Sequence, residues 1–196
     1  MASCIYRVTC DMNNFQSLEV VDRVVRASEA LDLDGHPRKA IWPTPTVCVV
    51  GADKPRGDFM AFGSPHLLVI RRSHPLSFFL ERSGELLPLR LPSGPDDLVV
   101  ANVKECINML DVDKSRYQPT GERDQLRVSH YVFHPNRGSE SSLFSEYRTR
   151  LSEVLCREET RQYSYPEGHG DDGNEFKAAC EFHKATGLKF ELLWEG

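Results

Sequence analysis

The segment from Asn174 to Trp194 constrains the fold most, because its pattern predicts a helix, a turn and a strand in immediate succession. Asn174 is a good N-cap, and Gly187 can adopt the left-handed conformation that ends a helix. A strand over Leu188–Trp194 follows directly. The apolar stripe of the expected helix consists of Phe176, Ala179, Cys180 and His183. This unit closes a domain and carries no catalytic set.

Size and charge narrow the classes of protein. With 196 residues, 40% of them hydrophobic, the chain can bury one core without disulfides or metals. The formal net charge of -5 argues against a surface built to neutralise phosphates. The basic pairs Arg38–Lys39 and Arg71–Arg72 are too short for a polybasic tract. We therefore expect neither nucleic acid nor a membrane as a partner.

The compartment is expected to be the cytoplasm. No stretch approaches the ~20 apolar residues of a membrane span, and Leu67–Ile70 is only strand-sized. The first eight residues lack the pattern of a secretory signal. The six cysteines show no pair at the two-residue spacing of a zinc or redox site, which predicts free thiols. They are Cys4, Cys10, Cys48, Cys106, Cys156 and Cys180.

The order of patterns predicts an α+β fold in which a mixed, largely antiparallel sheet is packed by a few helices. We expect one domain over 58–196 and an N-terminal arm over 1–57, whose prolines between Gly35 and Pro45 impose an extended path. The expected strands are Ile5–Val8, Val47–Val50, Leu67–Ile70, Glu85–Leu91, Asp97–Val103 and Leu126–His134. The expected helices lie within Leu18–Leu31, Ser73–Gly84, Cys106–Leu110 and Phe144–Glu159.

One set of histidines and carboxylates could hold a metal. It consists of His130, His134, His169, Asp171 and Asp172. If the segment around His130 is a strand, however, its two histidines stand about 13 Å apart, which is too far for joint ligation. The alternative prediction for the function is therefore a small metal-binding protein or hydrolase that uses these residues.

A second motif resembles the start of a calcium loop. Asp111, Asp113 and Ser115 have the required spacing, and Glu122 falls at the closing position. Arg116 replaces the glycine that such a loop needs, so we expect an ordinary polar turn. No nucleophile elbow or phosphate-binding loop is present in the sequence. The residues thus predict no enzyme, catalytic residue or cofactor.

Several segments over roughly residues 58–194 stand in an order that matches a known family. The most specific are Asn102–Ser115 and the closing Thr186-Gly187-Leu188-x-Phe190; others are Asp58-Phe59, Leu67–Ile70, Phe78–Leu80 and Leu86–Leu89. In this order the segments resemble an immunity-protein family of bacteria with polymorphic toxin systems, abundant in myxobacteria and formerly a domain of unknown function. The segment Phe144–Gly173 departs from the shorter family pattern, which suggests a role in partner specificity.

Membership implies a cytoplasmic protein that binds a cognate toxin, encoded nearby, and blocks it without covalent chemistry. Mildly acidic inhibitors suit toxins with basic clefts. We therefore predict that Glu167, Asp171, Asp172 and Glu175 contribute to partner association more than to folding. The residues leave the identity of the toxin and the oligomeric state open.

Overall fold

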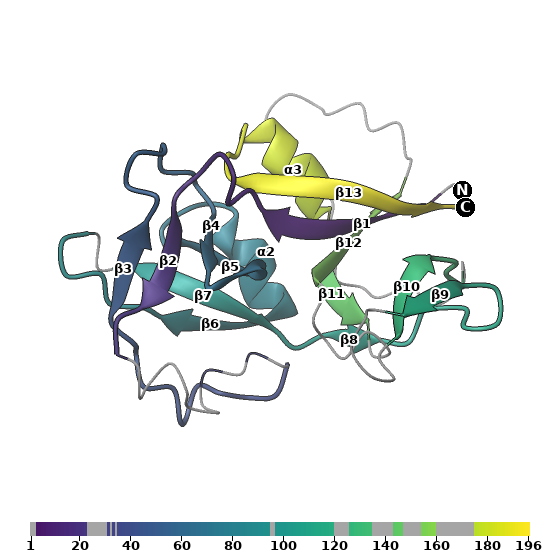
Figure 1. Ribbon diagram of the computed structural model, residues 1–196, viewed down its shortest axis with the longest axis horizontal. Helices are drawn as coiled ribbons and strands as arrows, with labels where there is room; N and C mark the ends of the chain where they lie inside the picture. The colour runs from purple at the N-terminus through teal and green to yellow at the C-terminus, as the bar shows by residue number, and fades with distance from the viewer. Residues whose placement is uncertain are drawn as a thin grey trace.

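The protein is mostly β-structure (Figure 1), as seen in a computed structural model. The structure describes residues 3–22, 31, 33, 35–94, 97–119, 126–134, 143–146, 154–159 and 175–196. Within this part of the chain, the strands form two main sheets and a separate two-stranded ribbon, accompanied by two short helices.

The larger sheet has six strands. Their spatial order is β3 (Val47–Val50), β2 (Ser17–Val20), β4 (Met60–Phe62), β5 (Ser64–Arg71), β7 (Leu98–Val103) and β6 (Gly84–Pro88). All neighbours are antiparallel except the parallel pair β2 and β4. β7, buried along its whole length, is an inner strand of this sheet.

The second sheet has five strands. Their order is β13 (Leu188–Glu195), β1 (Ser3–Cys10), β12 (Val154–Glu159), β11 (Leu143–Glu146) and β8 (Cys106–Ile107). Only β11 and β8 are parallel. The ribbon pairs β9 (Arg116–Pro119) with β10 (Leu126–His130). These pairings confirm the expected mixed, largely antiparallel architecture.

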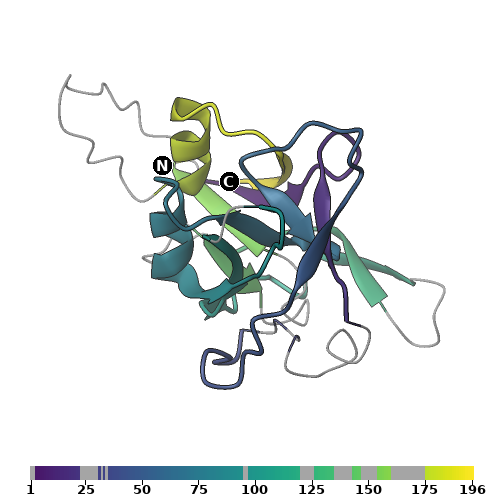
Figure 2. The same cartoon turned by 90° about the vertical axis from the view of Figure 1, so that its left-hand side faces the viewer.

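The helices α2 (Ser77–Ser83) and α3 (Phe176–Phe182) lie on the same side of the molecule, whereas the ribbon extends away from the opposite side (Figure 2). Each helix is only seven residues long. Helices of this length depend on packing for their stability. Both contribute buried side chains to a shared core.

Side-chain alternation along the inner strands distributes the core into three clusters. In β1, Val8 belongs to the first cluster and Ile5 to the third. In β5, Ile70 belongs to the first cluster and Val69 to the second. The first cluster joins both sheets to both helices, the second covers the other face of the six-stranded sheet, and the third lies between the five-stranded sheet and the base of the ribbon.

The expected N-terminal arm is part of both sheets. β1 is an inner strand, held between β13 and β12, while β2 and β3 belong to the larger sheet. The proline-rich stretch does lie against that sheet, because Trp42 donates from Nε1 to the Pro88 carbonyl at 2.7 Å and Asn102 donates from Nδ2 to the His36 carbonyl at 2.8 Å. A domain boundary near residue 57 stays a prediction.

One expected helix is wrong, and two others are contradicted only at the ends that the structure describes. The segment Leu18–Leu31 begins as β2, and its residues 23–30 lie outside the described ones, so a helix there stays a prediction. The predicted helix at Cys106–Leu110 is replaced by β8, and the described ends of Phe144–Glu159 are the strands β11 and β12. In each case pairing with a strand distant in sequence outweighs a weak local helical pattern.

The helix expected from Ser73 begins four residues later. Ser73 donates instead from its hydroxyl to the Asp97 carboxylate at 2.5 Å, and α2 starts at Ser77. The expected strands correspond to β1, β3, β5, β6, β7 and β10; β3 has the expected bounds, and the ends of the others are shifted. All six cysteines are free thiols; Cys48 and Cys106 are exposed and the other four are buried.

The predicted C-terminal helix, turn and strand are confirmed, with two changes. Glu175 occupies the N-cap position, while Asn174 lies outside the described residues. The helix ends at Phe182 with the exposed His183 as its C-cap, and Lys184 rather than Gly187 takes the left-handed conformation there, with φ 51°. Gly187 also has a positive φ, of 90°, and its position requires glycine for a second reason. A Cβ at this residue would lie 2.1 Å from the Phe59 carbonyl oxygen.

A latch formed by Asp58 and Thr186 joins the start of β4 to the start of β13. The Asp58 carboxylate accepts from the Thr186 hydroxyl at 2.7 Å and from the Thr186 amide at 2.9 Å. In return the Asp58 amide donates to the Thr186 hydroxyl at 3.0 Å, and the Phe59 amide donates to the Thr186 carbonyl at 3.0 Å. Two segments 128 residues apart are thereby fixed together.

Gly187→Ala should destabilise the protein by on the order of 3 kcal/mol, because the new methyl group collides with backbone and the residue has a positive φ. Gly63→Ala is the matched control: Gly63 also has a positive φ but has open space around it, so only about 1 kcal/mol is expected. Urea unfolding measures both. Equal losses would contradict the close approach to Phe59.

The latch should also make stability depend on pH. Burial raises the pKa of Asp58, but hydrogen bonds from Thr186 outweigh burial and hold the pKa below its ordinary value. A lowered folded-state pKa gives stability that is present above the unfolded-state pKa and lost as the pH falls through the folded one. Asp58→Ala should therefore destabilise the protein more at pH 7 than at pH 3 in urea unfolding. A pH-independent difference would contradict this role.

Candidate functional site

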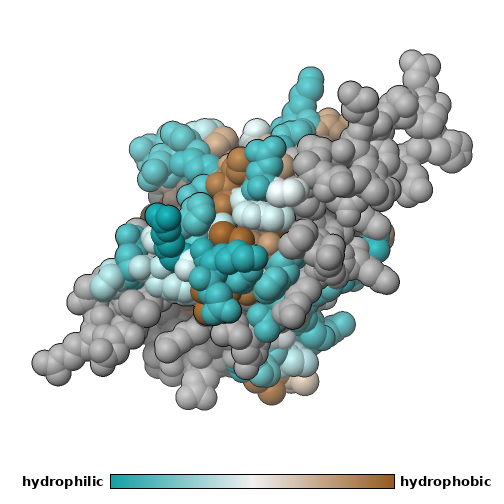
Figure 3. Space-filling model, turned by 90° about the vertical axis from the view of Figure 1, so that its right-hand side faces the viewer, coloured by the Kyte–Doolittle hydropathy of each residue, from teal (hydrophilic) through white to brown (hydrophobic). Residues whose placement is uncertain are grey.

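A groove of about 640 Å³ lies where the ribbon meets β1 and β13. Figure 3 shows this side of the molecule, on which hydrophobic and hydrophilic side chains are interspersed. Of its lining residues, only His130 belongs to a site predicted from the sequence. Its lining residues are Arg7, His66, Gln118, Val128, Ser129, His130, Tyr131, Glu191, Leu192 and Leu193.

Arg7 is the central polar residue of the groove. Its guanidinium donates from Nη1 to Glu191 Oε2 at 2.5 Å and from Nη2 to the Tyr131 hydroxyl at 2.7 Å. The side chain of Arg7 is only 19% exposed, whereas that of Glu191 is 64% exposed. A guanidinium fixed by two partners presents a preorganised surface rather than a mobile charge.

Aromatic packing holds Tyr131, one of the residues that line the groove. Tyr131 stacks on Phe133 with ring centroids 5.8 Å apart, and Phe133 meets Trp194 edge to face at 6.1 Å. Tyr131 and Phe133 are buried in the third core cluster. The chain leaving the ribbon is therefore anchored on the five-stranded sheet, and Tyr131 carries its hydroxyl to Arg7.

The ribbon is tied down at its base, since a two-stranded hairpin alone is marginally stable. The Ser115 hydroxyl accepts from the Val132 amide at 3.0 Å, and the Asp111 amide donates to the Val132 carbonyl at 2.8 Å. Near the groove, Ser129 donates to the Arg116 carbonyl at 3.2 Å, next to a register shift in β10. On the ribbon above this base, Arg116, Tyr117 and His130 are exposed.

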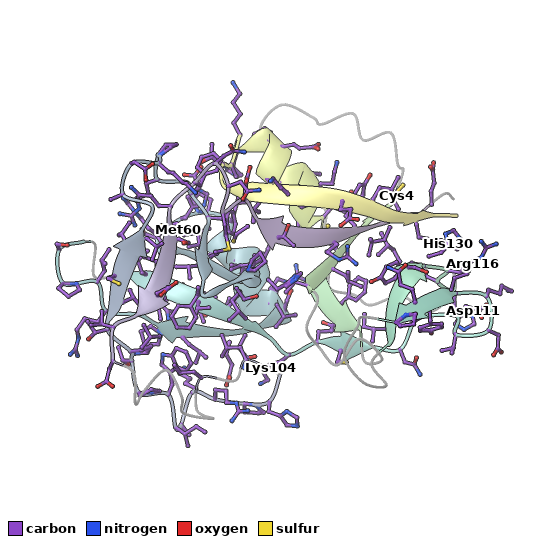
Figure 4. All side chains as sticks on the ribbon, in the orientation of Figure 1. Cys4, Met60, Lys104, Asp111, Arg116 and His130 are labelled. Atoms are coloured by element: carbon purple, nitrogen blue, oxygen red, sulfur yellow. The ribbon has the colours of Figure 1, made fainter. Side chains whose placement is uncertain are left out.

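The structure separates the two described histidines of the metal hypothesis. His130 ends β10 and lines the groove, beside Arg116 in the ladder (Figure 4). His134 lies past the ribbon, with Nδ1 3.8 Å from the Asp111 carboxylate. Among the described residues no group of three potential metal ligands comes together. His169, Asp171 and Asp172 lie outside them, so the metal reading stays untested.

Asp111 and Ser115 form the polar turn that the sequence predicted. The Asp111 carboxylate accepts from Lys114 Nζ at 3.0 Å and from the Lys114 amide at 3.2 Å. The side-chain hydrogen bond from Lys114 is the main cause that lowers the pKa of Asp111, and burial opposes it. Asp111 thus shapes the turn leading into the ribbon. Glu122, the expected closing residue, lies outside the described part of the chain.

Of the predicted partner-binding residues, only Glu175 is described. It is half-buried, and its carbonyl accepts from the Ala179 amide at 3.0 Å in the first turn of α3. Glu167, Asp171 and Asp172 lie outside the described residues. Their part in partner binding stays a prediction.

Comparison with known proteins adds no family: no protein-family model and no curated protein matches the chain. In the described residues, no helix has the length and apolar character needed to span a membrane. The functional reading therefore rests on the residues themselves and on the resemblance described above.

Tyr131→Phe should destabilise the protein by about 1–2 kcal/mol, because the partly buried Arg7 guanidinium loses its hydrogen bond to the Tyr131 hydroxyl. Tyr117→Phe removes an exposed hydroxyl from β9 and should change stability by less than about 0.5 kcal/mol. Urea unfolding of both variants makes the comparison. Indistinguishable stabilities would show that the Arg7 contact does not hold the groove together.

Proposed function

We propose that the protein is an immunity protein, which binds a cognate toxin in the cytoplasm and neutralises it by non-covalent occlusion. The observation that carries the proposal is the meeting of two segments on which the family resemblance depends. Asp58-Phe59 and Thr186-Gly187 form the latch, although 128 residues separate Asp58 from Thr186. Two motifs of the family pattern thus contact each other in the fold. This contact supports the resemblance more than the same motifs would if they lay apart on the surface.

The groove and the outer face of the ribbon are the proposed toxin-binding surface. Tyr117 is 38% exposed on β9, and His130 is exposed on β10. Exposed aromatic side chains on rigid elements supply much of the affinity in protein interfaces, and a surrounding polar rim supplies specificity. Arg7 and Glu191 compensate each other in charge, so a partner can cover them without leaving one buried charge alone.

This surface is separate from the residues that carry the resemblance. The latch fixes the start of β13, whereas the groove is lined by its later residues Glu191, Leu192 and Leu193. An immunity protein needs such a division, because one scaffold must present different binding surfaces to different toxins. The proposal therefore assigns the latch to folding and the groove to recognition.

The proposal is tested by co-expressing the protein with the product of the adjacent gene, using growth rescue and co-purification as readouts. We expect rescue together with a stoichiometric complex. Tyr117→Ala should weaken the complex at least about tenfold, because an exposed aromatic anchor is lost. Phe182→Ala is the matched control, since Phe182 is an exposed aromatic residue on α3.

Failure of the wild-type protein to rescue growth and to form a complex would overturn the immunity proposal. If rescue is insensitive both to Tyr117→Ala on the ribbon and to His130→Ala in the groove, the immunity proposal stands but the toxin binds another surface. Circular dichroism of each variant verifies that folding is intact.

A further inference from the structure

β13 has one side of its backbone without a neighbouring strand in the described part of the chain. It is the outermost strand of its sheet and pairs only with β1 there. The Asp11 amide donates to the Gly187 carbonyl at 2.8 Å, which fixes the alternation of the antiparallel ladder. The backbone groups of Leu188, Phe190 and Leu192 consequently point away from β1.

A bulge limits the regular part of this edge. Tyr6 pairs with Leu192 and Ile5 pairs with Trp194, so Leu193 is an extra residue. Beyond it the alternation of outward and inward backbone groups changes. The regular edge is therefore Leu188–Leu192, whose outward amides are spaced for pairing with another strand.

We propose that two copies of this chain associate through antiparallel pairing of their β13 strands, with the two-fold axis at Phe190. Phe190 then faces Phe190 of the second copy, and Leu188 faces Leu192. On the opposite face, Lys189 lies against Glu191 of the second copy. All outward amides and carbonyls of the regular edge find partners in this single register.

The side chains along this edge match themselves under the two-fold rotation. Lys189 and Glu191 have opposite charges, and their side chains are 49% and 64% exposed. Leu192 is 50% exposed, which is high for a large apolar side chain in a strand. Apolar and opposite-charge cross-strand pairs both stabilise an antiparallel ladder. The edge is thus complementary to a second copy of this chain.

The ion pairs already present extend this match. Within one chain, Lys189 Nζ lies 2.8 Å from Asp11 Oδ1, and Arg7 Nη1 lies 2.5 Å from Glu191 Oε2. In the proposed dimer, Asp11 and Lys189 of one copy are followed in the same row by Glu191 and Arg7 of the second copy. The sign of the charge alternates along this row. Charges of alternating sign along one row form a network, which contributes more than an isolated exposed pair.

The two-fold axis of this pairing is perpendicular to the plane of the sheet. Both copies therefore present the same face of their five-stranded sheets. The two grooves therefore open on the same side of the dimer. Their shared wall includes Glu191 and Leu192 from each copy. This dimer proposal does not depend on the identity of any toxin.

Charge reversal tests the register with the purified full chain in analytical ultracentrifugation. Lys189→Glu and Glu191→Lys should each weaken dimerisation at least about tenfold, since each places like charges opposite one another twice. An equimolar mixture of the two variants should recover the dimer, because both contacts in the mixed dimer again join opposite charges. Val49→Lys on the edge strand β3 is the control and should leave dimerisation unchanged.

The mixture separates pairing from folding, because intrachain repulsion at Asp11 or Arg7 is the same before and after mixing. If a charge variant does not fold, Leu192→Pro removes one outward amide, and Leu192→Ala is its matched control. The proline variant should be monomeric. A wild-type protein that is monomeric at about 100 μM, or a mixture no more dimeric than its components, overturns the proposal.

Discussion

The pairing of β1 with both β13 and β12 is the constraint on which the rest of the structure depends. Because β1 is an inner strand, its alternating side chains contribute to two core clusters, one on each face. Ile5 faces the base of the ribbon and Val8 faces the helices. Removal of either neighbouring strand would expose both clusters to water, so no part of the five-stranded sheet is stable by itself.

Some described residues are restricted by the contacts that hold the fold, whereas others contribute mainly to the exposed surface. Asp58, Thr186 and Gly187 have demanding geometry, because each is restricted by a close backbone contact or a reciprocal hydrogen bond. Tyr117 and His130 have exposed side chains on a ribbon anchored elsewhere. Substitutions in the second group change the surface and leave the core intact, as the proposed recognition surface requires.

Much of the architecture follows from short-range patterns in the sequence. Short apolar runs identify β5 and β7, and the helix, turn and strand at the C-terminal end are marked by their apolar spacing and Gly187. The sequence around Cys106 and Phe144 predicts helices, because nothing local indicates their distant strand partners. Nothing local indicates the groove either, because Arg7 meets Tyr131 and Glu191 only after β1, β10 and β13 are assembled.

The order of synthesis gives the position of β1 a kinetic consequence. Residues 3–10 emerge from the ribosome well before their hydrogen-bonding partners, which are residues 154–159 and 188–195. At typical elongation rates the N-terminal strand waits roughly 10–40 s for its neighbours. During that time its apolar side chains and both backbone edges are open to other chains. Cellular yield should therefore depend on chaperone binding to the nascent N-terminal segment, even for variants whose finished fold is fully stable.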